Sequence, residues 1–180
     1  MDEAYADFIP AEIRPSRTRD VAAGRPVVIL RTFSKLFGLA GLRLGYAVVH
    51  PDLIPSLDAV QEPFNVNRLA LAAGTACLAD PAAVEARRRQ VVAAREAFAA
   101  ALRDIGIPSW PSQANFVLAE PGGDDHAWYE GLLRRGFLVR PGSEFGLRGH
   151  LRITIGPDDL MASVASAIAE VREELGVPRG

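Results

Sequence analysis

The sequence contains a single lysine, and its neighbours are suited to binding a phosphate. Of the 20 Lys and Arg residues, only Lys35 is a lysine. A lysine amine can lose its proton and attack a carbonyl carbon, whereas an arginine guanidinium stays protonated and is a poor nucleophile. Ser34 precedes this lysine, and Arg43 follows it across a glycine-punctuated stretch. A hydroxyl, an amine and a guanidinium around such a bend can bind a phosphate and place an amine beside it.

Other interpretations of this stretch stay open. It could be a glycine-rich packing motif, a loose phosphate loop, or a bend that carries a surface lysine. The stretch lacks the Gly-Lys-Ser/Thr ending of a nucleotide P-loop and the Gly-x-Gly opening of a dinucleotide fold. The sequence therefore favours phosphate chemistry of a different kind.

Two further pairs of residues could take part in chemistry. Asp2 and Tyr5 bring a carboxylate and a phenol close to the start of the sequence, and Arg140 and Arg152 bring two guanidinium groups near its end. Asp2 could equally be a cap or a surface charge, and Arg140 a charge at a strand end. Cys77 is the only cysteine and lies in an apolar stretch, so we expect a buried side chain, no internal disulfide and no metal site.

Composition excludes several classes of protein. The hydrophobic share of 49% and the charged share of 23% are typical of a folded globular chain. The net charge of −2 provides no basic field for nucleic acid, and we interpret the run 87–89 as a solvated helix face. No apolar run reaches the roughly 18 residues of a membrane span, so we expect no membrane partner and a cytoplasmic location.

The elements that must position these residues follow from hydrophobic periodicity. Apolar runs predict strands at 27–30 and 44–49, and 15–24 is polar and loop-like. Helices are predicted over 51–61 and, after an N-cap at Asn67, from 68 to 78. A long amphipathic helix over 81–105 should place its arginines, including Arg95, away from its apolar face. The remaining elements are expected as a strand at 116–119, a helix at 127–135, strands at 138–140 and 151–155, and a helix from 158.

The order of several motifs carries a family resemblance. The string 32–46, Thr-Phe-Ser-Lys through Gly-Tyr, resembles the cofactor-lysine motif of class I/II aminotransferases of fold type I, and within them it is most similar to the histidinol-phosphate aminotransferase family. Four further motifs resemble that family in the same order: Asp-Glu-Ala-Tyr at 2–5, Pro-Phe-Asn-Val-Asn at 63–67, Ser-Gln-Ala-Asn-Phe at 112–116 and Leu-Arg-Ile-Thr-Ile-Gly at 151–156.

The resemblance implies that pyridoxal 5′-phosphate is the cofactor and assigns residues to it. Lys35 would hold the cofactor aldehyde as a Schiff base and later act as the catalytic base. Asp2 would pair with the pyridine nitrogen, and Tyr5 would donate to the phenolic oxygen. Ser34 and Arg43 would bind the phosphate.

The resemblance also implies the substrates. Arg152 would bind a substrate α-carboxylate, and Arg140 corresponds to a position that helps to recognise a substrate phosphate. The implied reaction is transamination between histidinol phosphate and 2-oxoglutarate in histidine biosynthesis. Transamination of aromatic amino acids and decarboxylation of phosphothreonine on the same fold are the alternatives.

The implied fold class is α/β: a partial cofactor-binding large domain over residues 1–80, a bridging helix over 81–105 and an α+β C-terminal small domain over 106–180. Motifs from the N-terminal half of the family have no counterpart in the sequence. We therefore expect a fragment whose site another chain must complete, and the alternative is a non-catalytic remnant. The strands at 27–30 and 44–49 would leave an open sheet edge, which favours dimerisation or aggregation.

Overall fold

The computed structural model describes residues 1–178, which divide into two compact units. The first unit is Met1–Arg89 and the second begins at Gln90, so the division falls inside the long helix α4 (Pro81–Asp104). The prediction of a long helix here is confirmed.

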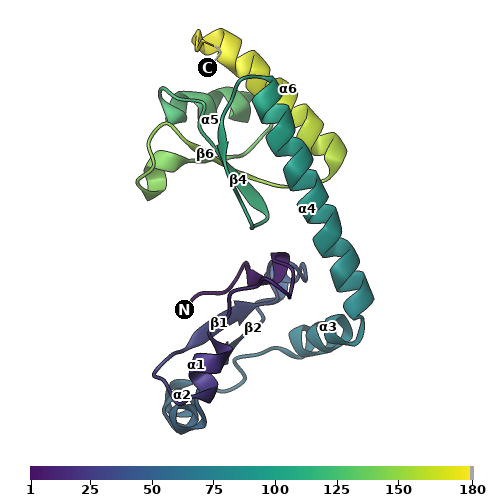
Figure 1. Cartoon of the computed structure of the whole chain (residues 1–180), viewed down its shortest axis with the longest axis vertical. Coiled ribbons are helices and arrows are strands. Elements are labelled where there is room, and N and C mark those ends of the chain that lie inside the picture. Colours follow the sequence, from purple (N-terminus) through teal and green to yellow (C-terminus); the bar gives the residue numbers. More distant parts are fainter. Residues whose placement is uncertain (179–180) are drawn as a thin grey trace. The chain divides into compact units, whose positions relative to one another are not determined.

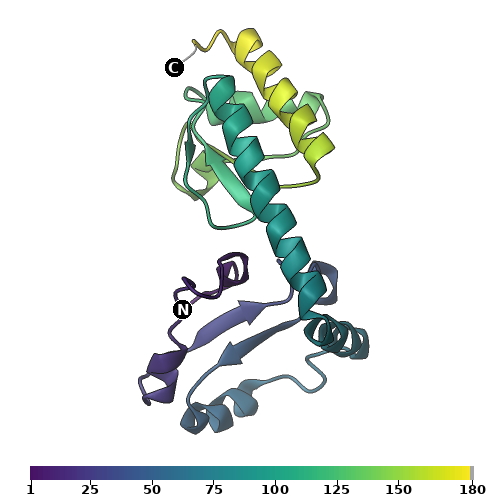
Figure 2. The ribbon, with the colours of Figure 1, turned by 45° about the vertical axis from the view of Figure 1, so that its right-hand side comes forward.

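The first unit is built around two short antiparallel strands. Strand β1 (Ile29–Thr32) pairs with β2 (Gly45–Val48), and Figure 2 shows them running in opposite directions. Asp2 adds an isolated parallel bridge to Leu30. The other elements before α4 are η1 (Ala6–Phe8), α1 (Thr18–Ala22), η2 (Ala40–Leu42), η3 (Pro51–Leu53), α2 (Ile54–Val60) and α3 (Arg68–Ala79).

Local signals explain most of these elements, with two corrections. Asn67 caps α3 as predicted, because its side chain accepts a hydrogen bond from Ala70 N at 2.9 Å. The stretch 15–24, expected to be a loop, contains the short helix α1. The first strand lies two residues later than expected because its pairing with β2 ends at Thr32. No single helix within residues 1–178 is long and apolar enough to span a membrane, although α3 and α4 would pass as a pair bent by 86°.

The second unit is a four-stranded antiparallel sheet with helices on one face. The strand order is β3-β4-β6-β5. Buried side chains of α4, α5 and α6 pack in one cluster on the sheet, and Figure 1 shows α4 and α6 side by side there. The elements are β3 (Ser109–Trp110), β4 (Phe116–Ala119), α5 (Asp125–Arg134), β5 (Arg140–Pro141), η4 (Gly142–Phe145), β6 (Leu151–Thr154) and α6 (Asp158–Leu175).

The apolar face of α4 is confirmed, but one arginine was placed wrongly. Phe98 and Leu102 are buried in the core of the second unit, with Val91 and Ile105 packed against it. Arg95 was expected away from this face, yet only 6% of it is exposed. Its Nη1 donates to the carbonyl of Ala114 at 2.9 Å, and that hydrogen bond holds the guanidinium inside.

Candidate active site

The first unit brings the lysine and the predicted tyrosine together. Lys35 Nζ lies over the ring of Tyr5, 5.4 Å from its centroid. The lysine follows the end of β1, and Tyr5 immediately precedes η1, so two separate segments supply the pair. Both side chains are partly buried.

The turn after Lys35 is held by backbone hydrogen bonds and one glycine. Gly38 N donates to the Lys35 carbonyl at 3.1 Å, and Leu39 N donates to the Phe33 carbonyl at 2.9 Å. Gly38 has φ +74°, a conformation that costs glycine little. The hydroxyl of Ser34 makes no hydrogen bond to the residues that the structure describes, so it is available to a ligand.

Arg43 adopts a conformation that is unusual for a non-glycine residue. Its φ is +56°, in the left-handed region, and its Nη1 donates to the Ala40 carbonyl at 2.9 Å. Such strain is held only where surrounding contacts fix it, and it is frequent at ligand sites. Asn67 supplies one of these contacts, since its Nδ2 donates to the Leu42 carbonyl at 3.0 Å. The exposed guanidinium is therefore presented from a fixed backbone.

Asp2 is held in place by a neighbour that the sequence did not single out. Asp2 Oδ1 accepts from Ala4 N at 2.9 Å. The next residue, Glu3, is only 7% exposed, and its Oε2 accepts from Arg31 Nε at 3.1 Å and Nη2 at 2.8 Å. Burial alone would lower the pKa of Arg31, but the hydrogen bonds of Glu3 and Tyr46 raise it above its ordinary value. The ion pair between Glu3 and Arg31 thus holds the segment 2–5 against β1.

These residues fit pyridoxal phosphate by the chemistry of their groups. An amine lies beside a phenol, a carboxylate stands at the isolated bridge to Leu30 of β1, and a hydroxyl and a guanidinium flank the turn after the lysine. No three His, Cys, Asp or Glu side chains in residues 1–178 gather into a possible metal site.

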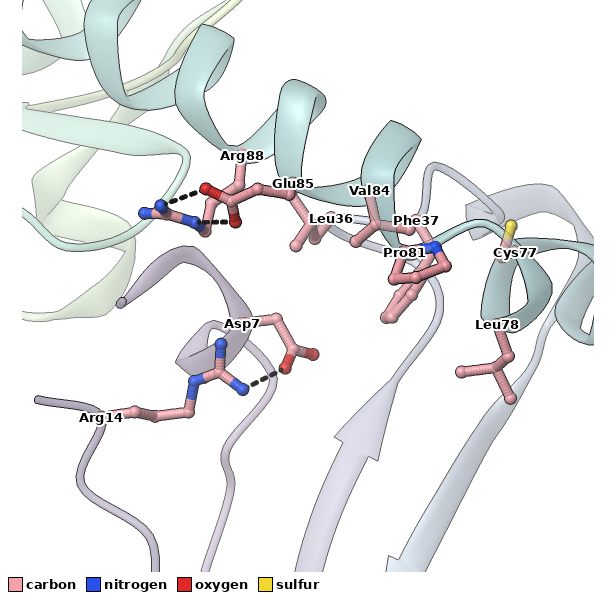
Figure 3. Close-up of a pocket in the computed structure, with 10 residues that line it drawn as sticks. All are labelled: Asp7, Arg14, Leu36, Phe37, Cys77, Leu78, Pro81, Val84, Glu85 and Arg88. Atoms are coloured by element: carbon pink, nitrogen blue, oxygen red, sulfur yellow. Dashed lines mark hydrogen bonds and ion pairs between the residues drawn. The ribbon is translucent and has the colours of Figure 1, made fainter. Parts of the chain in front are cut away.

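A pocket of about 240 Å³ lies beside the residues that follow Lys35 (Figure 3). Its charged groups are paired: Arg14 Nη1 contacts Asp7 at 3.1 Å, and Arg88 Nη2 contacts Glu85 at 2.6 Å. The run 87–89 was predicted to be a solvated helix face. For Arg88 this prediction is wrong, because its guanidinium is paired with Glu85 and partly buried. Cys77 lines the same pocket and is only partly buried, which corrects the prediction of a buried cysteine.

The second unit brings the two predicted substrate arginines together. Arg140 on β5 stands directly opposite Arg152 on β6, so both side chains lie on one face of the sheet. Arg152 also pairs with Leu118, which pairs with Trp110. These four residues form a cross-strand row on the face away from the helices.

Each arginine of this row has a neighbour of its own. Arg140 Nη2 lies 3.1 Å from Glu144 Oε2, an exposed pair of the kind that contributes little stability. The Arg152 guanidinium lies 4.3 Å from the centroid of the Phe116 ring. The ring is one contact that orients Arg152, and the exposed pair between Arg140 and Glu144 can be exchanged for another anion at small cost.

Comparison with known proteins defines the class. Residues 1–168 match the family described as Aminotransferase class I and II, and the chain belongs to this family. Enzymes of this family depend on pyridoxal phosphate.

Individual relatives are more specific. The chain is 40% identical over 172 residues to a histidinol-phosphate aminotransferase of Moorella thermoacetica, covering 95% of this chain and 45% of that protein. It superimposes with a TM-score of 0.89 and 30% identity on the histidinol-phosphate aminotransferase of Sinorhizobium meliloti in complex with pyridoxal-5′-phosphate, covering 97% of this chain and 48% of that one. It is also similar to an L-threonine-O-3-phosphate decarboxylase of Porphyromonas gingivalis, with a TM-score of 0.81, 28% identity and coverage of 96% and 54%.

The chain spans about half the length of the curated relatives that it matches. The predicted fold class is confirmed by these structures, in which the same architecture accounts for about half of each chain.

Proposed function

We propose that this chain supplies the lysine-bearing part of a pyridoxal-phosphate-dependent aminotransferase that acts on histidinol phosphate and 2-oxoglutarate. The observation that carries this proposal is the position of Lys35 Nζ over the Tyr5 ring, on a turn that also presents Ser34 and Arg43. Residues 1–80 would form part of the cofactor-binding domain, 81–105 the bridge and 106–180 the small domain.

Each residue has a distinct task at the cofactor. Bound pyridoxal phosphate supplies a positively charged ring that stabilises negative charge on the substrate Cα. Asp2 would favour the protonated form of the pyridine nitrogen, and Tyr5 would donate a hydrogen bond to the phenolic oxygen of the ring. Ser34 and Arg43 bind the phosphate. Lys35 holds the cofactor and then moves the proton at the substrate Cα.

The arginine row supports a substrate with a strongly anionic end. Histidinol phosphate carries a phosphate and no carboxylate, whereas 2-oxoglutarate carries two carboxylates. A guanidinium fork matches either group. Arg152 would bind the α-carboxylate of 2-oxoglutarate, a place that the phosphate of histidinol phosphate would take in turn. Arg140, released from Glu144, would add a second guanidinium for the phosphate.

The test is a titration of the purified chain with pyridoxal phosphate. We expect a visible absorbance band that Lys35→Ala abolishes, and Arg19→Ala, an exposed residue of α1, serves as the control. In the presence of cofactor, Lys35→Ala should reduce amino transfer from histidinol phosphate to 2-oxoglutarate by at least about 10²-fold. Absence of the band at saturating cofactor would favour the alternative, a non-catalytic remnant.

A second candidate reaction is decarboxylation of a phosphorylated amino acid. The two arginines on one sheet face and the similarity to the Porphyromonas gingivalis decarboxylase favour it over an aromatic substrate. Release of CO₂ from phosphothreonine, with no transfer to 2-oxoglutarate, would establish this alternative.

We also propose that copies of the chain associate into a homodimer. Large apolar side chains of the first unit are strongly exposed, among them Phe64 at 100%, Val60 at 80% and Leu69 at 71%. Soluble monomers rarely expose large contiguous apolar patches. A monodisperse monomer in light scattering would contradict this proposal.

A further inference from the structure

Arg95 is a buried charge without a salt-bridge partner among residues 1–178. Only 6% of it is exposed, and within residues 1–178 no carboxylate oxygen lies within ion-pair distance of its guanidinium. A guanidinium has five N–H donors. The hydrogen bond from Nη1 to Ala114 uses one of them.

Such a charge is unfavourable without a partner. Removing an ion from water is costly unless an opposite charge or hydrogen bonds replace the hydration. Burial lowers the pKa of Arg95, although the negative charge of Glu96 opposes this effect. The guanidinium nevertheless remains protonated at neutral pH. An anion beside it would remove the deficit.

A pocket of about 390 Å³ lies beside Arg95, between α4 and the β3–β4 hairpin. A second guanidinium, Arg103, lines it from two turns further along α4, and Ser109 and Gln113 line it from the hairpin. Glu96 is the one acidic residue among its lining residues. The lining therefore carries a formal charge of +1, from two arginines and one glutamate.

The remaining lining residues are apolar except for Ser112, and the pocket has the size of a ligand site. Ala99, Val117 and Trp110 supply this part of the lining. Pockets for small molecules typically measure about 300–1,000 Å³ and combine apolar walls with a few polar groups. The occupant should accordingly have an anionic end and an apolar body.

This pocket differs from the pocket in Figure 3 and from the arginine row, with which it shares only Trp110. It adjoins β3, at one edge of the sheet, whereas Arg140 stands on β5 at the other edge. The pocket in Figure 3 pairs both of its arginines with carboxylates, so it has no unpaired cation.

We propose that the pocket between α4 and the β3–β4 hairpin binds a small organic oxyanion, whose charged end pairs with Arg95 and Arg103 and whose apolar body contacts Ala99 and Val117. This site is additional to the transamination chemistry and does not depend on it.

The experiment is a titration of the full chain with phenyl phosphate and with benzoate, followed by amide NMR shifts and by calorimetry. The two probes distinguish phosphate from carboxylate recognition, and phenol is the uncharged control. We expect shifts at residues 95–103 and 109–114 that saturate with at least one anion and are absent with phenol. Shifts confined to 140 and 151–152 would place the anion on the arginine row and overturn the proposal.

Three variants complete the test without altering the buried arginine. Arg103→Gln should weaken binding by about tenfold, the loss expected for one charge-assisted hydrogen bond. Glu96→Gln should tighten it about twofold, because a nearby negative charge is removed. Arg134→Gln, an exposed arginine on α5, should leave it unchanged. Equal affinities in all four proteins, or no binding of either anion, would overturn the proposal.

Discussion

Residues from Gln90 onward bury one continuous cluster of hydrophobic side chains, whereas the described residues 1–89 have no comparable cluster. In the first unit the buried hydrophobic side chains are smaller in number and include Phe8, Ile29 and Phe33. Polar contacts hold parts of the first unit in place. The Glu3–Arg31 ion pair holds the segment 2–5 against β1, and the hydrogen bond from Asn67 to the Leu42 carbonyl holds the stretch before Arg43.

This difference separates stability from chemistry. The proposed cofactor residues belong to the unit with the smaller core, where single hydrogen bonds fix their positions. The arginine row stands on the outer face of the well-packed sheet, where strand pairing fixes it. We therefore expect core substitutions to affect mainly stability, and substitutions of these polar contacts to affect stability and cofactor binding together.

The largest effect is expected from the core of the second unit. Trp128 is fully buried, and its Nε1 donates to the Gly122 carbonyl at 3.0 Å. Trp128→Ala should lower the free energy of unfolding by about 3–5 kcal/mol, measured by urea denaturation. Trp110→Ala, at a position that is 57% exposed, should change it by less than about 1 kcal/mol. Similar losses for both would contradict the core assignment.

The corresponding change in the first unit is Glu3→Gln. It leaves the partly buried Arg31 without its counter-charge and should cost about 3 kcal/mol. Because the segment 2–5 is then released from β1, the affinity for pyridoxal phosphate should fall as well. Glu12→Gln, at an exposed position, is the control. Lost stability with unchanged cofactor affinity would show that Glu3 does not position Asp2 and Tyr5.

A smaller, pH-dependent effect is expected at Asp125. Burial opposes ionisation of this carboxyl group, but hydrogen bonds outweigh it and lower its pKa, including one from Ser143 N at 2.6 Å. A lowered folded-state pKa stabilises the protein above the unfolded pKa, and this contribution is lost as the pH falls through the folded value.

Asp125→Asn should therefore cost about 2 kcal/mol at pH 7, and the difference from the wild type should shrink below about pH 4. Urea denaturation at a series of pH values measures it, with the exposed Asp104→Asn as control. A difference that stays constant down to pH 2 would contradict the role of the ionised carboxylate.

The smallest effect concerns Phe64, which has φ +59° and a fully exposed side chain. Phe64→Gly should raise the free energy of unfolding by about 0.5 kcal/mol, because glycine adopts this conformation with little strain. Leu138→Gly, also strongly exposed but without a positive φ, should lower it by a similar amount. Thermal denaturation distinguishes the two signs, and equal destabilisation by both would contradict strain at Phe64.

Much of this fold could be predicted where the signals are local. The Asn67 cap predicted the start of α3, and the apolar run 116–119 predicted β4 to the residue. The end of α4 followed from Gly106. In each case, neighbouring residues alone decide the outcome.

Features that depend on tertiary contacts were not predictable. Helical periodicity placed Arg95 outside the apolar face. The hydrogen bond to the Ala114 carbonyl, which allows the guanidinium to be buried, comes from a distant segment that the periodicity of one helix does not contain. Glu3 lies inside the motif at 2–5, but only its ion pair with Arg31 in the structure shows that it holds this segment against β1. The register that places Arg140 opposite Arg152 likewise depends on strand pairing.

Under the proposed function, that register makes the connection between β5 and β6 a determinant of substrate choice. Gly142 N donates to the His150 carbonyl at 2.8 Å, and a Cβ on Gly142 would collide with backbone there, so the turn has little freedom. Side chains alternate faces along a strand, and a shift by one residue would turn Arg140 toward the helices. If the arginine row binds the substrate as proposed, an insertion here that shifts the register would change the anion site with every arginine retained.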